Sequence, residues 1–420
     1  MRRQLPITLL IAAAVAAVFA LFALGCGAAT EPEPEAEVDA PDHARWMLEH
    51  TDDYLHDASW RRAQLEASLW RPELPYARKR LTAYALEDSG WDLLPKIDAR
   101  VMPVGNEPVG NEPAFDGRRI TPEQTPQTYD EWLALGEDVF WSMPMRRDTY
   151  LKWLVERPDL WDEVGFETRE DGTLRGLVRY EDDRGRLRTA ATCGLCHGAR
   201  GEAGRAAREL DLGRGRELFA RARGAEPGAY TEWPAGTVDV TDDGVTDPLS
   251  IPDLWGLSHA RYINSSAAVR VASPASLAIR FETQYIPGHS MEARPDRRLT
   301  WALAMYVLSL ERPARPDTQP RDTSAGLELF EQHCADCHLP DEGFGGDLVE
   351  ADELPVDQKA AHSAFRGTGF YKVPSLIGIS EAAPYLHDAS APTLRAFLDN
   401  GHPELTDAQR DQLIDYLETL

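Results

Sequence analysis

Two short segments of the sequence combine cysteine and histidine in one pattern. Cys193-Gly-Leu-Cys196-His197 and Cys334-Ala-Asp-Cys337-His338 each place two thiols three positions apart and an imidazole directly after them. On one turn of helix, two such thiols reach the two vinyl groups of one porphyrin, and the histidine then lies beneath the iron. The pattern therefore predicts two covalently bound haem c groups. The predicted attachment residues are Cys193, Cys196, Cys334 and Cys337, and the predicted proximal iron ligands are His197 and His338.

Paired cysteines also occur in zinc sites and in dithiol redox sites. Zinc ribbons commonly separate their two pairs by about 15–20 residues, whereas these pairs begin at residues 193 and 334. A dithiol site would not need a histidine after each pair. The chain has five cysteines, and haem attachment at both motifs leaves only Cys26 to be explained.

Cys26 ends a segment that has the features of an export signal. Arg2 and Arg3 precede an apolar run from Ile7 to Leu24, which leads into Gly25-Cys26. This pattern resembles a bacterial lipoprotein signal, in which the cysteine becomes the lipidated N-terminus, although Ala23 stands where leucine is usual. An uncleaved membrane anchor is the alternative. Residues 27–42 are rich in glutamate and proline and read as an extended tether. We expect a periplasmic protein attached to the membrane through Cys26.

Length and charge limit the number of domains and the kind of partner. At 420 residues and 43% hydrophobic content, the chain can build two or three packed domains. Its formal net charge of −26 argues against nucleic acid as a partner, because phosphates would repel it. The same charge fits either docking of basic proteins or simple solubility.

Hydrophobic periodicity and turn residues predict a mainly α fold with three further segments. Residues 43–128 form a helical N-terminal extension and linker, within which a turn-rich pentapeptide is repeated at 103–113. Residues 129–312 form a first cytochrome c-like haem domain, with a helix from about Tyr129 and a hairpin between 165 and 188. Residues 313–420 form a second such domain, in which one helix leads into Cys334 and another follows Thr406.

An internal repeat supports two tandem haem domains. Ile251–Tyr262 can be laid on Val373–Tyr385 with one inserted residue, and both copies contain Pro-x-Leu-x-Gly-x-Ser. Each copy lies downstream of one cysteine motif. The chain therefore carries two related haem domains in succession.

The second axial ligand decides whether each haem only carries electrons or also binds a small molecule. His259, His289 and Met291 follow the first motif, and His362, His387 and His402 follow the second. No methionine lies after Met305, so the second haem has no thioether ligand from its own domain. Its sixth position is then held by histidine or tyrosine or is open, and the lack of a thioether lowers its expected potential. We take His289 and His402 as the candidate distal ligands.

The C-terminal hundred residues resemble a known family. Gly369-Phe-Tyr-Lys-Val-Pro-Ser-Leu376, Ala382-Ala-Pro-Tyr-Leu-His-Asp388 and Thr393-Leu394 are similar to signatures of the bacterial di-haem cytochrome c peroxidase and MauG superfamily. The segment at 133–140 resembles that family's first helix more loosely. The resemblance implies that hydrogen peroxide binds at the first haem, with a carboxylic acid protonating the leaving oxygen. It also implies that electrons enter at the second haem from a small cytochrome c or a cupredoxin.

Several positions depart from the family pattern. Tyr262-Ile-Asn-Ser265 stands where the family often has a tryptophan between the haems, so the electron path needs another bridge. Glu282 and Glu292 are the available candidates for the catalytic acid. Ser250 and Ala382 stand at positions used for calcium, so calcium is doubtful. His402 lies within one residue of the family's distal methionine or tyrosine.

Three functions stay open at this point, and with them the question of whether the chain is an enzyme. One is a peroxidase-like oxidoreductase that reduces hydrogen peroxide. Another is a di-haem electron-transfer cytochrome that keeps the fold without the peroxide site. The third is an oxygenase of the rubber-cleaving di-haem type, which the segments at 233–239 and 251–255 resemble loosely, although this chain is much shorter.

Overall fold

The computed structural model describes most of the chain beyond the tether. The described residues are 43–84, 94–98, 100–105, 115–182, 184–239, 241, 246–314, 322–401 and 404–420. Cys26, the tether and His402 lie outside them. Residues 40–420 form one compact unit, and it is mainly helical, as predicted. No helix in the described ranges is long and apolar enough to cross a membrane.

Short helices build the N-terminal extension. They are α2 (His43–Glu49), α3 (Thr51–His56), α4 (Ala58–Ala67) and α5 (Pro75–Tyr84). They pack against α10 (Ala275–Gly288) and α11 (Arg297–Leu308) of the predicted first haem domain. Tyr54 on α3 stacks on Trp301 of α11 with ring centroids 4.4 Å apart, and both side chains are fully buried. The extension therefore shares one core with the helices that it covers.

An antiparallel sheet lies beside these helices, in the strand order β2-β1-β4-β5-β3. The hairpin predicted between residues 165 and 188 is present as β4 (Thr173–Glu181) and β5 (Leu187–Ala191). Of the segment at 103–113, which was expected to be a loop or linker, residues 103–105 instead belong to β1 (Arg100–Gly105), which pairs with β4. Residues 106–113 lie outside the described residues. The edge strands are β2 (Arg118–Arg119) and β3 (Arg146–Arg147). The sheet matters for the site because β5 runs directly into the first cysteine motif.

Besides the short α8 (Cys193–His197), three more helices belong to the first part of the chain: α6 (Tyr129–Ser142), α7 (Thr149–Val155) and α9 (Leu212–Ala222). Helix α6 begins where predicted, because Thr128 and Glu131 form a reciprocal capping box. It crosses α11 closely at Gly136, where a Cβ atom would lie 2.2 Å from the Ala302 carbonyl oxygen. Short two-stranded ladders follow. They are β6 (Thr237–Val238) with β7 (Leu249–Ser250), and β8 (Tyr262–Ile263) with β9 (Val269–Arg270).

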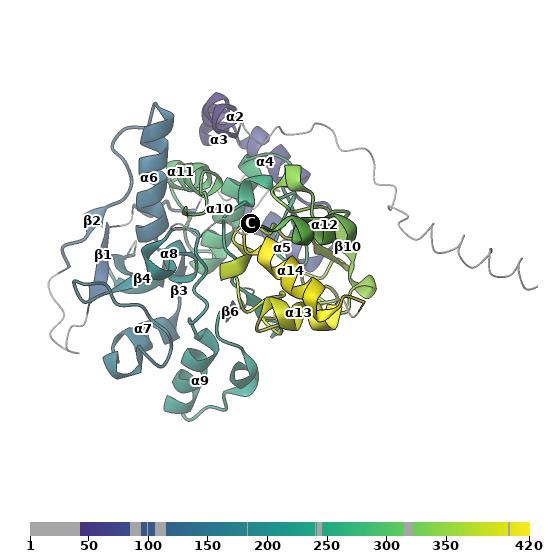
Figure 1. Ribbon diagram of the computed structural model, residues 1–420. Coiled ribbons are helices and arrows are strands. Elements are labelled where there is room, and N and C mark those ends of the chain that lie inside the picture. The colour runs from purple at the N-terminus through teal and green to yellow at the C-terminus, as the bar shows by residue number, and fades with distance from the viewer. Residues whose placement is uncertain are drawn as a thin grey trace, which may run out of the picture. The chain divides into compact units, whose positions relative to one another are not determined.

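The C-terminal part has its own small core. Helix α12 (Ser324–His333) packs on α14 (Asp407–Leu417), and Figure 1 shows both beside α13 (Leu394–Gly401) in green and yellow. The close crossing occurs at Gly326, where a Cβ atom would meet the Gln412 carbonyl oxygen at 2.1 Å. A ladder of β10 (Leu348–Glu350) and β11 (Phe370–Lys372) completes this part. The predicted helix after Thr406 is confirmed, with Thr406 and Gln409 as its capping box.

Asp182 fixes the turn of the hairpin that delivers the first motif. Its Oδ1 accepts from the backbone N–H groups of Arg184 and Arg186, and its Oδ2 accepts from the Nε atoms of Arg186 and Arg188 at 2.9 and 3.0 Å. The side chain is only 2% exposed. Burial by itself would raise the pKa of this carboxyl, but the hydrogen bonds from Arg186 and Arg188 hold its pKa well below the ordinary value.

We expect Asp182→Asn to lower the free energy of unfolding at pH 7 by about 1–3 kcal/mol, the range for hydrogen bonds to charged groups. Because the folded pKa is depressed, this stabilisation is present above the unfolded pKa of about 4 and is lost as the pH falls below it. Chemical denaturation at pH 7 and pH 3 measures the difference, which should shrink in acid. Asp159→Asn, at an exposed position, is the control. A difference that is the same at both pH values would contradict this explanation.

Candidate haem-attachment sites

The first motif is a short helix held between a tryptophan and a strand. It forms α8 (Cys193–His197). The Trp141 indole lies so close to the motif that a Cβ atom on Gly194 or Gly198 would be 2.4 Å from its ring. On another side, Gly176 of β4 has φ +72° and leaves no room for a side chain beside the Leu195 backbone. The motif backbone is therefore fixed by α6 and β4 together.

His197 has the protonation geometry that an iron ligand needs. Its Nδ1 lies 3.0 Å from the Pro252 carbonyl oxygen. A carbonyl oxygen only accepts, so Nδ1 carries the proton and donates it, and Nε2 keeps its lone pair. Burial lowers the pKa of His197 to about 4, so the ring is neutral at pH 7. A hydrogen bond of this kind behind a ligating histidine orients the ring and sets its tautomer.

The second motif follows α12 and has the same arrangement behind its histidine. Its backbone turns through bonds from the N–H groups of Cys337 and His338 to the Cys334 carbonyl, at 3.0 and 2.8 Å. His338 Nδ1 donates to the Phe344 carbonyl oxygen at 2.8 Å. Burial lowers the pKa of His338. Its Nε2 is therefore the nitrogen left to bind iron.

Pro252 and Pro374 occupy the same position in the two copies of the internal repeat. Each copy then reaches a glycine with positive φ, Gly256 at +77° and Gly378 at +79°, and each glycine precedes a short 3-10 helix, η7 (Leu257–His259) or η10 (Ile379–Glu381). The repeat read from the sequence therefore has a counterpart in three dimensions. In the first copy the Pro252 carbonyl accepts from the His197 ring, and in the second copy the Pro374 carbonyl acts on the pKa of His338.

The two copies also pack against each other. A Cβ atom on Gly378 would lie 2.9 Å from the Trp255 ring, and one on Gly256 would lie 3.1 Å from Ile377 Cδ1. Trp255 and Ile377 are equivalent residues of the repeat. Trp255 is buried, and its Nε1 donates to the Ala203 carbonyl at 3.3 Å. The same indole thus contacts the chain just after the first motif and the repeat that supports the second.

Ion pairs surround this contact. Arg205 pairs with Glu381 of the second copy and lies over the Trp255 ring, with its Cζ 5.2 Å from the ring centroid. Arg312 also pairs with Glu381, at 3.6 Å, and donates to the carbonyl of Leu420. These contacts join residues from both sides of the predicted boundary at 313.

The raised pKa values of the thiols fit covalent attachment of a haem better than dithiol redox chemistry. All four cysteines of the motifs are free of disulfides. Burial raises the pKa of Cys193 and Cys196 to about 12 and that of Cys334 to about 11, whereas redox-active cysteines have lowered pKa values. Two neutral thiols one turn apart, followed by an imidazole with a free Nε2, are the donor set for a covalently held haem. The residues present therefore fit this group.

The three side chains considered as distal ligands of the first haem are hydrogen-bonded, exposed or packed elsewhere in the structure. His289 is fully buried, its Nε2 lies 2.7 Å from the Pro144 carbonyl, and its Nδ1 lies 3.3 Å from the Tyr180 hydroxyl. Both ring nitrogens are engaged, so iron binding by His289 would require these bonds to break. Met291 is 40% exposed. His259 instead packs at the second motif, where a Cβ atom on Gly343 would lie 2.8 Å from its ring.

The two candidate acids have different surroundings. Glu282 is completely buried and accepts a short hydrogen bond from Tyr54 of the N-terminal extension. Thr300 and Arg297 complete this network, at 3.4 and 3.9 Å from the carboxylate. Glu292 lies at the surface in an ion pair with Arg147 at 2.6 Å, and that hydrogen bond lowers its pKa. Glu282 is therefore covered by the extension, and Glu292 is held by an arginine.

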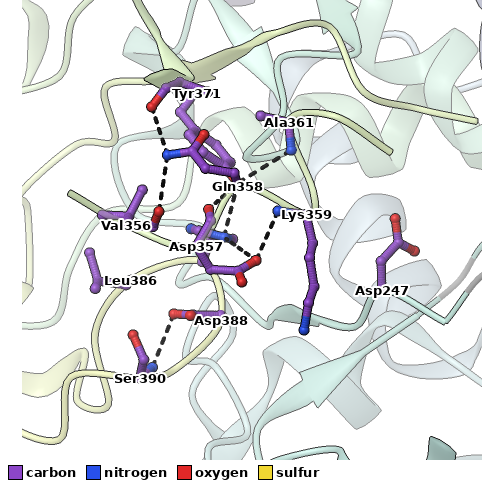
Figure 2. Close-up of polar contacts among 12 residues, drawn as sticks. Asp247, Val356, Asp357, Gln358, Lys359, Ala361, Tyr371, Leu386, Asp388 and Ser390 are labelled. Carbon is purple, nitrogen blue, oxygen red and sulfur yellow. Dashed lines mark hydrogen bonds and ion pairs between the residues drawn. The ribbon is translucent and has the colours of Figure 1, made fainter. Parts of the chain in front are cut away.

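The histidines of the second part serve local networks. His387 Nε2 lies 3.0 Å from the Tyr371 hydroxyl, which also donates to the Asp357 carbonyl and accepts from the Ala361 N–H (Figure 2). His362 is exposed on the surface and pairs with Asp352 at 2.9 Å. His402 remains a prediction, since it lies outside the described residues. Ser250 donates its Oγ to the Leu386 carbonyl. In the described part of the chain, no cluster of acidic, histidine or cysteine side chains is arranged to hold a metal ion by itself.

Comparisons with known proteins add only a weak likeness in fold. No protein-family model and no curated protein matches the sequence. Hydrazine synthase of Kuenenia stuttgartiensis, studied under xenon pressure, is 15% identical over 75% of this chain and 100% of its own, with a TM-score of 0.37. A MauG-like protein associated with microbial copper homeostasis is 15% identical over 71% of this chain and 91% of its own, with a TM-score of 0.29. The functional argument therefore depends on the residues themselves.

Proposed function

We propose that the chain is an exported di-haem c-type cytochrome that transfers electrons. The observation that carries the proposal is the matched pair of histidines. His197 and His338 each follow two cysteines, donate through Nδ1 to a backbone carbonyl, and leave Nε2 for iron. When bound, haem supplies reversible one-electron chemistry at its iron. The protein's residues attach it, orient the proximal ligand and keep that ligand in one tautomer.

Electron transfer between the two haems is supported by the contact between the repeat copies. Trp255 joins the chain after the first motif to Gly378, four residues after Pro374. The two motifs are thus connected through one packed interface. We propose that this interface keeps the haems at a fixed separation.

Reduction of hydrogen peroxide at the first haem is the second candidate, supported by the C-terminal peroxidase-family signature. Against it, Glu282 is bonded to Tyr54 and Glu292 to Arg147. Neither carboxyl is free to give a proton to a bound peroxide in this arrangement. Electron transfer without peroxide chemistry is therefore the function that the geometry favours.

Partners and location follow as parts of the same proposal. A lipid on Cys26 and the acidic tether would hold the protein at the periplasmic face of a membrane. The formal charge of −26 would favour a donor with a basic docking face, such as a small cytochrome c or a cupredoxin.

Spectroscopy of the purified holoprotein tests the proposal. We expect two low-spin, six-coordinate ferric haems in the resting EPR spectrum and no change on adding cyanide or peroxide, with or without partial reduction. For the first haem this requires a sixth ligand, and if that ligand is His289, its hydrogen bonds to Pro144 and Tyr180 must be given up. A high-spin haem that binds cyanide or peroxide would instead support the peroxidase. A protein that carries no haem when matured in an export-competent host would overturn both functions.

A further inference from the structure

The residue after the proline of each repeat copy ties that copy to the loop that follows the preceding motif. This position holds Asp253 in the first copy and Ser375 in the second. Both side chains form hydrogen bonds with the backbone of that loop. One of the two side chains carries a negative charge and the other does not.

Asp253 holds the segment that follows the first motif. Its Oδ1 accepts from the Ala206 N–H at 2.7 Å, and the Gly204 N–H bonds to the His197 carbonyl at 2.8 Å. The residue before Asp253 is Pro252, whose carbonyl accepts from His197 Nδ1. The Asp253 side chain therefore fixes this carbonyl against the segment that is bonded to the backbone of the proximal histidine.

Ser375 makes the corresponding contact in the second copy. Its Oγ donates to the Gly343 carbonyl at 2.6 Å and accepts from the Ile377 N–H at 3.2 Å. Gly343 directly precedes Phe344, whose carbonyl accepts from His338 Nδ1 at 2.8 Å. In both copies, the side chain after the proline thus fixes the peptide whose carbonyl orients a proximal histidine.

The charges at the two positions differ. The Asp253 side chain is only 10% exposed and pairs with Arg208 at 2.8 Å. Arg208 also donates to the Ile251 carbonyl at 2.6 Å, so both charges are fixed to the first copy of the repeat. A neutral hydroxyl stands at the equivalent position, Ser375. Because charges near a protein interior are screened less than charges in water, Asp253 and Arg208 act with opposite signs on an iron bound by His197.

We propose that Asp253 is a positioning residue for His197 and that its carboxylate lowers the reduction potential of the first haem. The inference rests on the proposed function, because it requires the haem attached at the first motif. A fixed hydrogen bond behind a ligating histidine raises the basicity of that ligand. A nearby negative charge favours ferric over ferrous iron. Ser375 supplies the first of these two effects at His338 without the second.

Spectroelectrochemical titration of the holoprotein with Asp253→Asn tests the effect of the charge. Asparagine keeps the oxygen that accepts from Ala206 and removes the negative charge, so we expect one midpoint potential to rise and the other to stay unchanged. Arg208→Gln removes the opposite charge and should lower the same potential. Asp171→Asn is the matched control, because this exposed carboxylate also accepts from a backbone N–H, that of Thr173. Both of its potentials should match the wild type.

Exchange of the proximal Nδ1 protons with solvent tests the positioning. In the ferrous holoprotein, the proton NMR spectrum in heavy water follows the loss of each histidine Nδ1–H signal. Asp253→Ala removes the hydrogen-bond acceptor as well as the charge, and we expect one signal to exchange severalfold faster than in the wild type or in Asp253→Asn. Ser375→Ala should speed the exchange of the other signal and leave unchanged the potential that Asp253→Asn raises.

Two results would contradict the role of Asp253. One is a pair of potentials that do not respond to Asp253→Asn or that rise equally, since a fixed charge at this position acts on one haem. The other is an Nδ1 exchange rate in Asp253→Ala equal to that of the wild type. A pyridine haemochrome assay that finds fewer than two haems in the wild type overturns the proposed function itself, whereas two haems with unresponsive potentials overturn only the role of Asp253.

Discussion

Cys193→Ala combined with Cys196→Ala should yield a protein that carries half of the wild-type haem. Each haem is held by thioether bonds formed when two thiols add across two vinyl groups, and the two motifs are independent in sequence. Loss of one thiol pair therefore removes covalent attachment at one site only. The mass of the denatured chain should fall by one haem, and the pyridine haemochrome should report one haem per chain.

The reciprocal variant provides the control. Cys334→Ala combined with Cys337→Ala should also lose one haem, but its spectrum should retain the haem that the first variant lacks. The two single-haem spectra should then add up to that of the wild type. Both variants retaining two covalent haems would exclude thioether attachment at these cysteines. A zinc-loaded protein without haem would revive the metal-site alternative.

Trp255→Ala should be the most destabilising single substitution at the interface between the repeat copies. The indole is buried, fits against Gly378 and donates to the Ala203 carbonyl. Alanine would leave a cavity and an unpaired carbonyl. Such a truncation is expected to lower the free energy of unfolding by about 3–5 kcal/mol. Denaturant unfolding of the holoprotein, followed by tryptophan fluorescence and by the haem spectrum, measures it.

Trp255→Phe is the graded control, since it keeps most of the ring and loses the N–H donor. Trp255→Phe should lower the free energy of unfolding clearly less than Trp255→Ala does. The haem content of both variants should stay at the wild-type level, because neither substitution touches a cysteine or a proximal histidine. If Trp255→Ala lowers the free energy of unfolding by less than about 1 kcal/mol, the indole does not support the interface.

Local signals were sufficient to predict several elements. The capping residue Thr406 marked a helix that the structure confirms, because a cap acts on the next three residues of the chain. The alternation of apolar residues between 165 and 188 predicted the β4–β5 hairpin, because the two-residue period of a strand is also a local signal. The internal repeat also pointed to Pro252, although the role of its carbonyl as the acceptor from the His197 ring became clear only in the structure.

Features that depend on distant partners could not be predicted. The segment at 103 reads as a turn, but it becomes β1 because β4 offers it an edge. Glu282 was a candidate acid on its spacing, yet its hydrogen-bond partner Tyr54 lies 228 residues earlier in the chain. Trp255 stood out only as a position of the repeat, and its contacts with Gly378 and with the Ala203 carbonyl could not be predicted. They come from surfaces that meet only when both copies of the repeat are folded.

Trp255 packs against Gly378, and Ile377, the equivalent residue of the other copy, packs against Gly256. Each copy offers the other the same patch that it receives, which is the geometry of an isologous dimer interface within a single polypeptide. Such a patch is self-complementary, so halves separated at the 313 boundary would each expose a surface suited to self-association. The unequal volumes of tryptophan and isoleucine oppose this, because two large side chains or two small ones fit less well than one of each. The sequence difference at this one repeat position thus favours pairing between unlike halves.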